Sequence, residues 1–567
     1  MSLLSQPGSA KLPDAEILAL IEQGFEAFGR GELAAAAQAA DRILALEGNQ
    51  VDALYLKGRI AHQQERLDAA QDFYERAILS RPDFVDPYLK LIALLLTTDR
   101  NDSALAAWRY ALAHVKPDPA LLAELCGPMV ENFAAEARET LRPVLAHAGA
   151  TIGTWTLYQQ VLHRLRVDGA EYDELMAGMR ARFGSTAEVE AAEAMALSYR
   201  DRVDEASQAY QAMRDKYPHL AFFDGELARA YRDSGRLDEA ERQVLQLAQV
   251  SPSADYDFML AELRLQCGLI GEGLALYERR FDRPLGFNWK HLPFPNWRGE
   301  SLAGKKIVVF EEQGLGDSIM FGRYLPALIA QGARVAYVCR PELYALFASQ
   351  PSLRRAEIHA RTRAIPLTGG EDYYVSAVSI AHCLGIDTAA ASLRCAYLEA
   401  DPQRIAHWAK QLPRHGRRRV GIAWAANLAT GIGNSKSMPP ALVASLLGDP
   451  ALTAVVDFVS LQVPAALDAP HRHLYAATPE IADFSDTMAV IANLDLVVSV
   501  DTSVAHLAAS MGKPTIVMSK FAPDWRWAAP AGGPPYWYPQ VEVIRQAEPR
   551  DWASALQRLT QRLKEPG

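Results

Sequence analysis

The stretch that decides the fold is Leu494–Met518, L-D-L-V-V-S-V-D-T-S-V-A-H-L-A-A-S-M-G-K-P-T-I-V-M. Leu494–Val500 is an almost continuous apolar run rich in β-branched residues, which is typical of a strand buried on both faces of a parallel sheet. Polar residues follow at once, and a helix is expected to begin at about Ser503 and to end at the G-K-P segment. Thr515–Met518 then returns to the sheet. The pattern predicts strand, tight turn, helix and strand.

Four polar residues stand where this strand ends and the helix begins: Asp501, Thr502, Ser503 and His506. The N-terminus of a helix presents unpaired N–H groups and a partial positive charge, which together hold anions and above all phosphates. The stretch is therefore a candidate phosphate site. The alternative is an ordinary strand–turn–helix unit without a ligand.

Composition sets the limits of the protein class. A chain of 567 residues that is 50% hydrophobic is expected to fold into about three to four globular domains. The net charge of −10 argues against general affinity for nucleic acid. The five cysteines show no C-x-x-C spacing, so reduced thiols and a cytoplasmic location are expected. Neither a secretion signal nor an apolar run long enough for a transmembrane segment is visible.

The first half of the chain repeats with a period of 34 residues, since Gly24 recurs as Gly58, and Ala36 as Ala70 and Ala104. This period, with small residues where two helices cross, is the tetratricopeptide pattern. The repeats are predicted over 1–282, in degenerate form over 120–190. Such units stack into a solenoid that usually binds a protein or extended peptide. The alternative is a structural spacer or a dimerisation surface.

An α/β region follows the all-α solenoid. A linker is predicted at 283–302, rich in proline and aromatic residues, and two doubly wound Rossmann-like domains at 303–412 and 413–567, the second closed by a helix. The strands are predicted at Lys305–Phe310, Val335–Cys339 and Asp372–Val375 in the first domain, and at Val420–Trp424, Val456–Leu461, Leu494–Val500, Thr515–Met518 and Val541–Arg545 in the second. The ligand cleft is expected where the carboxyl-end loops of the two domains face one another.

Three further motifs accompany these strands. In E-E-Q-G-L-G-D, Gly314 and Gly316 are expected to let the backbone turn sharply, and Asp317 to start a helix. A polar loop after Trp424 carries Lys436 and Ser437 shortly before the next helix. An aromatic segment, F-A-P-D-W-R-W, follows the strand that ends at Met518.

Together, E-Q-G-L-G-D, the K-S-M-P loop and V-D-T-S-V-A-H with G-K-P resemble glycosyltransferase family 9, the heptosyltransferase-like enzymes of the GT-B fold. The resemblance covers roughly Lys305 to Leu563. Fusion to tetratricopeptide repeats, with the F-A-P-D-W-R-W segment, is similar to bacterial repeat-containing glycosyltransferases, one branch of which modifies flagellin with nonulosonic acids such as pseudaminic acid.

The resemblance implies an inverting, metal-independent transfer from a nucleotide-activated sugar, without a cofactor, and it implies the roles of the site residues. Asp317 would be the general base, and Lys436 would contact the donor phosphate. The other donor-binding residues would be Gly314, Gly316, Asn427, Ser437, Asp501, Thr502, Ser503 and His506, with Trp525 and Arg526 on the acceptor side or in a lid. Each role has a structural alternative: Asp317 as a helix cap, Lys436 as a solvated loop lysine, and His506 as a satisfied histidine in the interior.

The resemblance thus favours a cytoplasmic protein O-glycosyltransferase whose repeats bind the acceptor, with flagellin as acceptor and a CMP-linked nonulosonic acid as donor. The alternatives are a sugar transferase of lipopolysaccharide or capsule assembly and a non-catalytic repeat scaffold that keeps the GT-B fold. Two departures from the family pattern, Ala426 before Asn427 and the A-A-P-A-G-G-P-P-Y segment, lie near the expected donor or acceptor surface and leave the sugar open.

Overall fold

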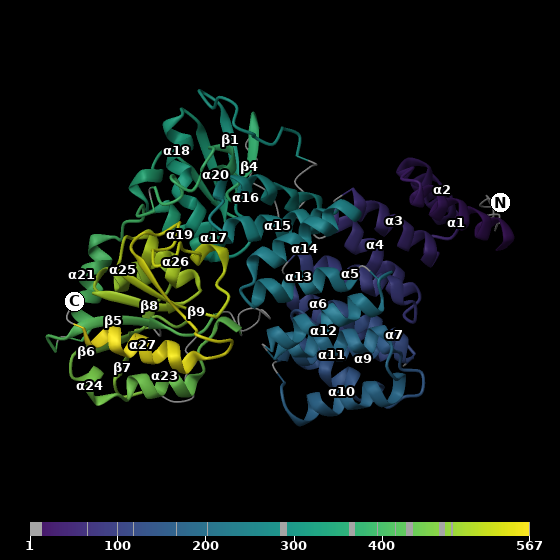
Figure 1. The fold of residues 1–567 in the computed structure, drawn as a ribbon. Coiled ribbons are helices and arrows are strands. Elements are labelled where there is room, and N and C mark those ends of the chain that lie inside the picture. The colour runs from purple at the N-terminus through teal and green to yellow at the C-terminus, as the bar shows by residue number, and fades with distance from the viewer. Residues whose placement is uncertain are drawn as a thin grey trace. The chain divides into compact units, whose positions relative to one another are not determined.

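The computed structural model describes residues 14–565 except 65, 99, 117, 166, 201, 221, 284–291, 362–368, 394, 414, 427–434, 464–470 and 478–479 (Figure 1). The chain divides into two compact units, Met1–Val189 and Glu190–Gly567. The described part of the first unit is made of helices and turns. The second unit contains the last helical repeats together with two parallel sheets.

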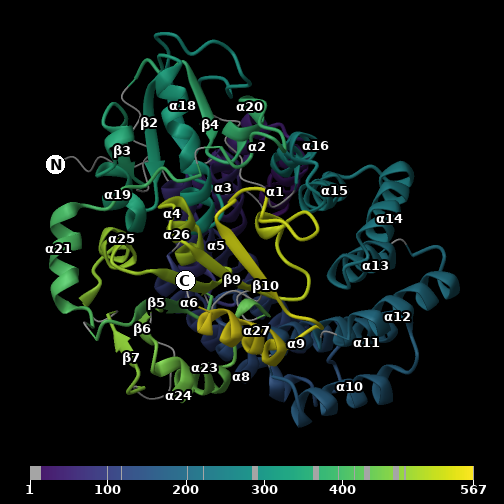
Figure 2. The same cartoon turned by 60° about the vertical axis from the view of Figure 1, so that its left-hand side comes forward.

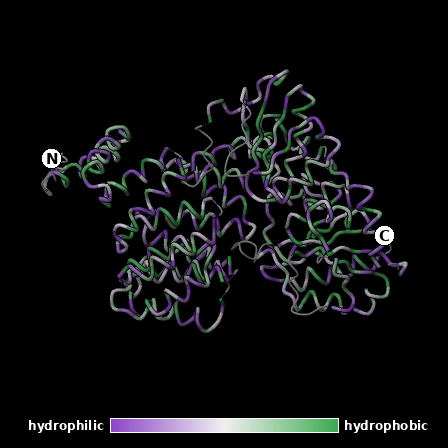
Figure 3. The backbone as a smooth tube through the Cα atoms, turned by 180° about the vertical axis from the view of Figure 1, so that it is seen from behind, coloured by the Kyte–Doolittle hydropathy of each residue, from purple (hydrophilic) through white to green (hydrophobic). Residues whose placement is uncertain are grey.

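The first unit consists of helices that pack in consecutive pairs, such as α1 on α2, α3 on α4 and α5 on α6. Ala36, Ala70 and Ala104 are fully buried, since their small side chains let neighbouring helices approach closely. The helices alternate between hydrophilic and hydrophobic residues along their turns, as expected when one face packs on the next repeat (Figure 3). Their bounds are α1 (Asp14–Gly29), α2 (Leu33–Leu46), α3 (Val51–Gln63), α4 (Leu67–Ser80), α5 (Val85–Thr97), α6 (Asn101–His114), α7 (Pro119–Cys126), η1 (Gly127–Met129), α8 (Ala134–Val144), α9 (Ile152–Leu165) and α10 (Ala170–Phe183).

The second unit begins with helices of the same kind, after α11 (Ala187–Tyr199), which crosses the division. A Cβ at Gly273 would lie 2.6 Å from Leu265 Cγ, so only glycine lets α15 and α16 cross this closely. The stretch predicted to hold degenerate repeats is also helical, from α7 to α11. The helices of this part are α12 (Val203–Lys216), α13 (Phe222–Asp233), α14 (Leu237–Val250), α15 (Ala254–Gln266), α16 (Ile270–Tyr277) and η2 (Glu278–Asp282).

The first sheet of the second unit has four parallel strands in the order β3-β2-β1-β4. Helices α17 to α19 cover one face, and Phe294 of the described part of the predicted linker packs on the other. The elements are β1 (Lys306–Phe310), α17 (Leu315–Phe321), η3 (Gly322–Tyr324), α18 (Leu325–Ala330), β2 (Arg334–Cys339), α19 (Pro341–Ala348), η4 (Pro351–Leu353), β3 (Glu357–Ala360), β4 (Tyr373–Ser376), α20 (Ser379–Cys383) and α21 (Pro402–Gln411).

The second sheet has six parallel strands in the order β10-β9-β8-β5-β6-β7. Helices α25 and α26 cover one face, and α23, α24 and α27 cover the other (Figure 2). Both faces are therefore buried, which explains the apolar run in β8. The elements are β5 (Arg418–Ala423), α23 (Pro440–Leu447), α24 (Pro450–Thr453), β6 (Val456–Ser460), β7 (Leu474–Ala476), α25 (Phe484–Ala492), β8 (Leu496–Val500), α26 (Ser503–Ser510), β9 (Thr515–Ser519), η6 (Trp525–Trp527), β10 (Val541–Arg545) and α27 (Trp552–Lys564).

The two-sheet architecture and the eight predicted strands are confirmed, with bounds that shift by one or two residues. The sequence analysis missed β3 and β7. Both are edge strands, and β7 has only three residues, so neither carries the apolar run that marks a strand buried on both faces. The α/β region therefore has two parallel sheets with packed helices, as the sequence analysis predicted for the GT-B fold, and a helical-repeat solenoid precedes it.

Candidate functional site

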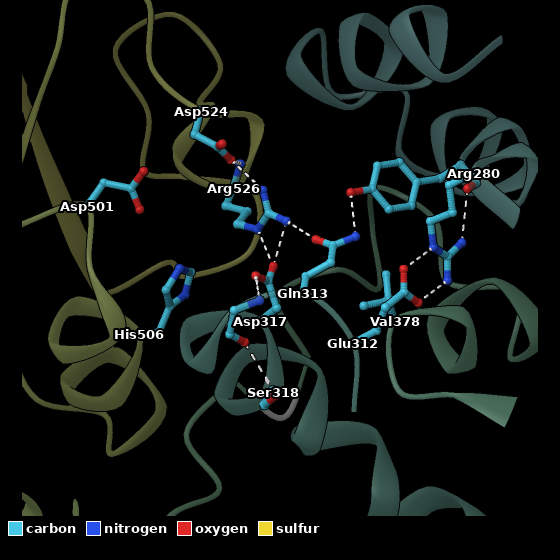
Figure 4. A network of polar contacts seen from close by, with 12 residues as sticks. Arg280, Glu312, Gln313, Asp317, Ser318, Val378, Asp501, His506, Asp524 and Arg526 are labelled. Carbon is cyan, nitrogen blue, oxygen red and sulfur yellow. Dashed lines mark hydrogen bonds and ion pairs between the residues drawn. The ribbon is translucent and has the colours of Figure 1, made fainter. Parts of the chain in front are cut away.

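Three polar segments of the second unit come together at the carboxyl ends of strands (Figure 4). The loop after β1 leads to Asp317 in the first turn of α17. The loop after β8 places Asp501 and Thr502 at the start of α26. A third segment, after β9, carries Asp524 and Arg526 in and beside η6. Loops at the carboxyl ends of parallel strands are the usual place for a ligand site in this class of fold.

Asp317 and Arg526 form the contact between the first and third segments. The Arg526 Nε donates to Asp317 Oδ1 at 2.7 Å, and its Nη2 lies 2.5 Å from the same oxygen. The other carboxylate oxygen of Asp317 accepts from the Gly314 amide at 3.0 Å, as a capping residue in the first helical turn does. The predictions that Asp317 starts the helix or is its N-cap are wrong, because α17 begins at Leu315 and its N-cap is Gly314. Asp317 is the third helical residue, and its carboxylate binds the N-cap amide, a contact that is compatible with a role as a base.

Asp524 links Arg526 to a second cation, Lys436. Arg526 Nη1 donates to Asp524 Oδ1 at 2.8 Å, and Lys436 Nζ lies 4.0 Å from Asp524 Oδ2. Lys436 also forms a short ion pair with Asp501, whose other oxygen accepts from the Trp527 indole at 2.7 Å. Two cations and three carboxylates are therefore held together, and Lys436 is not a solvated loop lysine, because its side chain is only 19% exposed.

The surroundings shift the pKa values of Asp317 and Asp524 in opposite directions. Burial raises the pKa of Asp317 above its ordinary value, and Arg526 offsets that rise only in part. Burial alone would also raise the pKa of Asp524, but Arg526 and Lys436 hold it well below its usual range. Burial alone would lower the pKa of Lys436, yet Asp501 and Asp524 raise it, so the ammonium keeps its charge. Asp317 is therefore the carboxylate better suited to accept a proton.

His506 is buried in the first turn of α26, where only 2% of its surface is exposed. Its Nδ1 hydrogen-bonds with the Tyr538 hydroxyl at 3.0 Å, and its ring packs on Trp527 at 4.5 Å. Burial lowers its pKa to about 3, so the ring is neutral at physiological pH. These contacts match the interpretation of a satisfied interior histidine; a role for His506 toward a donor stays a prediction.

The prediction that Gly314 and Gly316 make the sharp turn is wrong. Gly314 has φ −93°, and the residue in the left-handed region is Gln313, with φ 67°. Gly316 is needed for a different reason, since a Cβ there would lie 2.7 Å from His506 Cδ2. Glycine at this position lets α17 of one sheet approach α26 of the other.

The remaining predicted residues lie around this cluster. Thr502 caps α26 through its backbone and shares a hydrogen bond with Ser499 at 3.0 Å, and Ser503 is the first residue of the helix. Ser437 accepts from the Ala426 amide at 3.0 Å. Asn427 lies outside the described residues.

Trp525, predicted on the acceptor side or in a lid, is buried instead, and Arg526 stacks over its ring at 4.1 Å. Sequence reasoning missed three residues with a direct part in the network, Asp524, Gln313 and Tyr277. Asp524 stands inside the quoted F-A-P-D-W-R-W segment, two positions before Arg526. That spacing of an acid and an arginine was the signal that could have indicated an ion pair. Gln313 stands inside the quoted E-E-Q-G-L-G-D motif, and Tyr277 takes the large-residue position of the last repeat, four residues after Gly273, but neither pattern indicates a polar partner.

The arrangement can support a transfer reaction in which a phosphate is the leaving group. Lys436, Arg526 and the N-terminus of α26 supply positive charge at one place, and the Asp317 carboxylate stands beside it. No group of three or more His, Cys, Asp or Glu side chains in the described part of the chain is arranged to hold a metal ion. The helices described by the structure include none that could span a membrane.

Two family models match the chain. The model of glycosyltransferase family 9 (heptosyltransferase) matches residues 464–527, which include Asp501, Asp524 and Arg526. The tetratricopeptide repeat model matches residues 21–83 and 225–283. The chain therefore carries tetratricopeptide repeats and a glycosyltransferase domain similar to heptosyltransferases.

Among curated proteins, the chain is similar to Protein FlbA of Caulobacter vibrioides, with 28% identity over 394 residues. The alignment covers 61% of this chain and 64% of that protein, so the chain matches less than two thirds of its relative's length.

Solved structures include partial matches to each half. A glycosyltransferase family 9 protein from Veillonella parvula is 13% identical, with a TM-score of 0.35 over 44% of this chain and 88% of its own. A tetratricopeptide repeat protein from Parabacteroides merdae is 15% identical, with a TM-score of 0.33 over 48% of this chain and 94% of its own.

Proposed function

We propose that the protein is an inverting, metal-independent glycosyltransferase that transfers a sugar from a nucleotide-activated donor to a hydroxyl group of a protein. The observation that carries this proposal is the contact of Asp317 with Arg526 beside Lys436. It places a carboxylate of raised pKa next to two cations at the carboxyl edges of the strands. The glycosyltransferase family match over residues 464–527, which include Arg526 and Asp524, supports the same reaction class.

In this mechanism Asp317 takes the proton of the acceptor hydroxyl as its oxygen forms the new bond to the sugar. The bond between the sugar and the donor phosphate breaks, and its electron pair leaves with the phosphate oxygen. Lys436, Arg526 and the N-terminal amides of α26 stabilise the charge on that phosphate. In other transferases a divalent ion stabilises the charge on the leaving phosphate. Here Lys436 and Arg526 would supply that positive charge, so the proposal needs no metal.

The proposed acceptor is flagellin, and the proposed donor is a CMP-linked nonulosonic acid such as pseudaminic acid. The support is the combination of repeats, family 9 domain and F-A-P-D-W-R-W segment, which resembles the flagellin-modifying branch. Tetratricopeptide repeats are protein-binding modules, so they are the proposed acceptor-binding arm. We place the reaction in the cytoplasm, where the five free cysteines would stay reduced.

The test is transfer by the purified full chain, with flagellin and the CMP-linked sugar as substrates and intact-mass spectrometry of flagellin as readout. A mass increase that survives EDTA supports the proposal. Asp317→Asn should reduce the rate by about 10²-fold or more, the scale for loss of a general base, because asparagine can still accept from Arg526 but cannot take a proton. Sugar transfer to a lipopolysaccharide precursor instead of flagellin, or no transfer from any nucleotide-sugar, would overturn it.

A further inference from the structure

The last helical repeat reaches into the site through Tyr277, the final residue of α16. Its ring is 3% exposed and packs against Phe258 at 4.9 Å and Trp525 at 5.9 Å. Its hydroxyl accepts a hydrogen bond from the side-chain amide of Gln313 at 2.8 Å. A residue of the repeat array thus touches the loop that follows β1.

The Gln313 side chain connects Tyr277 to Arg526. The Oε1 of Gln313 accepts from Arg526 Nη2 at 2.8 Å, while its Nε2 faces Tyr277. Because a guanidinium can only donate, the amide oxygen must face Arg526, and the amide nitrogen must then face the tyrosine. The chemistry of the two partners therefore fixes the orientation of this amide.

The backbone of Gln313 is held in an unusual conformation. Its φ of 67° lies in the left-handed region, which residues other than glycine seldom adopt. Arg340 Nη2 donates to the Gln313 carbonyl at 2.7 Å. A strained residue of this kind persists only where the surrounding structure holds it, and such residues cluster at functional sites.

From these contacts we propose that Tyr277 and Gln313 are positioning residues for sugar transfer. They fix Arg526, and Arg526 fixes the carboxylate of Asp317 (Figure 4). The last repeat then contributes a positioning residue to the catalytic site and also belongs to the proposed acceptor-binding arm. This inference rests on the proposed role of Asp317 as the base of the transfer.

Hydrogen exchange of the full chain tests the positioning without any substrate. The Gly314 amide donates to Asp317 and the Arg526 amide donates to Asp524, so their exchange rates report where the two carboxylates lie. Tyr277→Phe, which keeps the ring but removes the hydroxyl, should speed exchange of both amides, as should Gln313→Ala. Tyr324→Phe is the matched control, because Tyr324 is also 3% exposed and its hydroxyl has no hydrogen-bond partner among the described residues.

Transfer kinetics test the consequence for chemistry. Tyr277→Phe and Gln313→Ala should lower kcat by about 10- to 10²-fold, since a small misplacement of reacting groups has costs of that order. The KM for the CMP-linked sugar should stay within about twofold, because neither side chain is proposed to bind the donor. Tyr324→Phe should turn over like the unaltered protein.

A third variant separates positioning from a merely structural effect. Gln313→Glu keeps a hydrogen-bond acceptor for Arg526 but adds a negative charge near Asp317. The new carboxylate also competes with Asp317 for the Arg526 guanidinium. The acid limb of the pH–rate profile should therefore move to higher pH. A change that only loosened the fold would lower the rate without moving this limb.

Unchanged exchange at Gly314 and Arg526 in both Tyr277→Phe and Gln313→Ala would overturn the inference. So would normal kcat in both variants, or an unmoved acid limb in Gln313→Glu. If the unaltered protein transfers no sugar, the proposed function fails. The exchange measurement then decides by itself whether Tyr277 and Gln313 hold Arg526 and Asp317.

Discussion

Arg280 and Glu312 form a buried, two-pronged ion pair, with Nε to Oε1 at 2.7 Å and Nη2 to Oε2 at 2.8 Å. Arg280 lies in η2, directly after the last repeat, and Glu312 lies in the loop after β1. The arginine also donates to Ser379 at 2.8 Å. Both charged side chains are no more than 5% exposed. The end of the repeat array and the first sheet are therefore joined by a contact that water does not screen.

The first prediction concerns this ion pair. Arg280→Met should lower the free energy of unfolding of the second unit by about 3–5 kcal/mol, because it leaves the Glu312 carboxylate buried without its partner. Urea titration followed by tryptophan fluorescence measures the change. The double variant Arg280→Met with Glu312→Leu should recover much of the loss, since two apolar side chains of similar size replace the pair. Equal stability of the single variant and the unaltered protein would contradict this account.

A second prediction concerns the close approach of α17 and α26. Gly316→Ala should destabilise the protein by about 1–3 kcal/mol, because the added Cβ would meet the buried His506 ring at 2.7 Å. Gly225→Ala in α13 is the control. Its Cβ would meet nothing nearer than 3.9 Å, so alanine should stabilise that helix by about 0.5–1 kcal/mol. Thermal unfolding compares the two, and similar shifts in both would remove the steric explanation.

The parts of the fold that the sequence predicts are those with a repeating or continuous apolar pattern. The repeated alanines, such as Ala70, mark the helix crossings because they must be small wherever the same contact recurs. Leu494–Val500 marks a central strand because both its faces are buried. These patterns are local, so one sequence is enough to detect them.

The contacts that the sequence does not predict are polar and join distant segments. Arg280 with Glu312, and Tyr277 with Gln313, pair residues at the end of the repeat array with the loop after β1. The repeat pattern marks the Tyr277 ring as buried but not the partner of its hydroxyl, and no periodicity marks the other three residues, because each pair forms only once. The family resemblance drew attention to Asp317 and Arg526, but only the structure shows that they touch.

The third prediction tests phosphate binding. Lys436→Ala and Thr502→Ala should each weaken nucleotide binding by about 1–3 kcal/mol, the scale of a lost charge-assisted hydrogen bond. Calorimetric titration with CMP, and with ADP, GDP and UDP in parallel, measures the loss and identifies the preferred base. Lys410→Ala on α21 is the control, since that lysine is exposed. Unchanged nucleotide affinity in both site variants would place the donor phosphate elsewhere.

The last prediction concerns pH. Asp317 acts as a base only when deprotonated, and burial raises its pKa, so the transfer rate should fall on acidification at a higher pH than the ordinary aspartate value of about 3.9 would give. Arg526 lowers the pKa of Asp317 and Asp524 raises it. Arg526→Gln should therefore move the acid limb to higher pH, and Asp524→Asn should move it to lower pH.

These opposite shifts identify the group that titrates. His506 is not expected to produce the limb, because burial lowers its pKa to about 3 while burial raises the pKa of Asp317 above its ordinary value. The measurement is kcat/KM for the full chain between pH 4 and pH 9, a range of about five units that brackets the ordinary carboxyl and imidazole values. If both variants moved the limb in the same direction, or neither moved it, another group would be controlling the rate, and Asp317 would keep only its structural contacts with the Gly314 amide and Arg526.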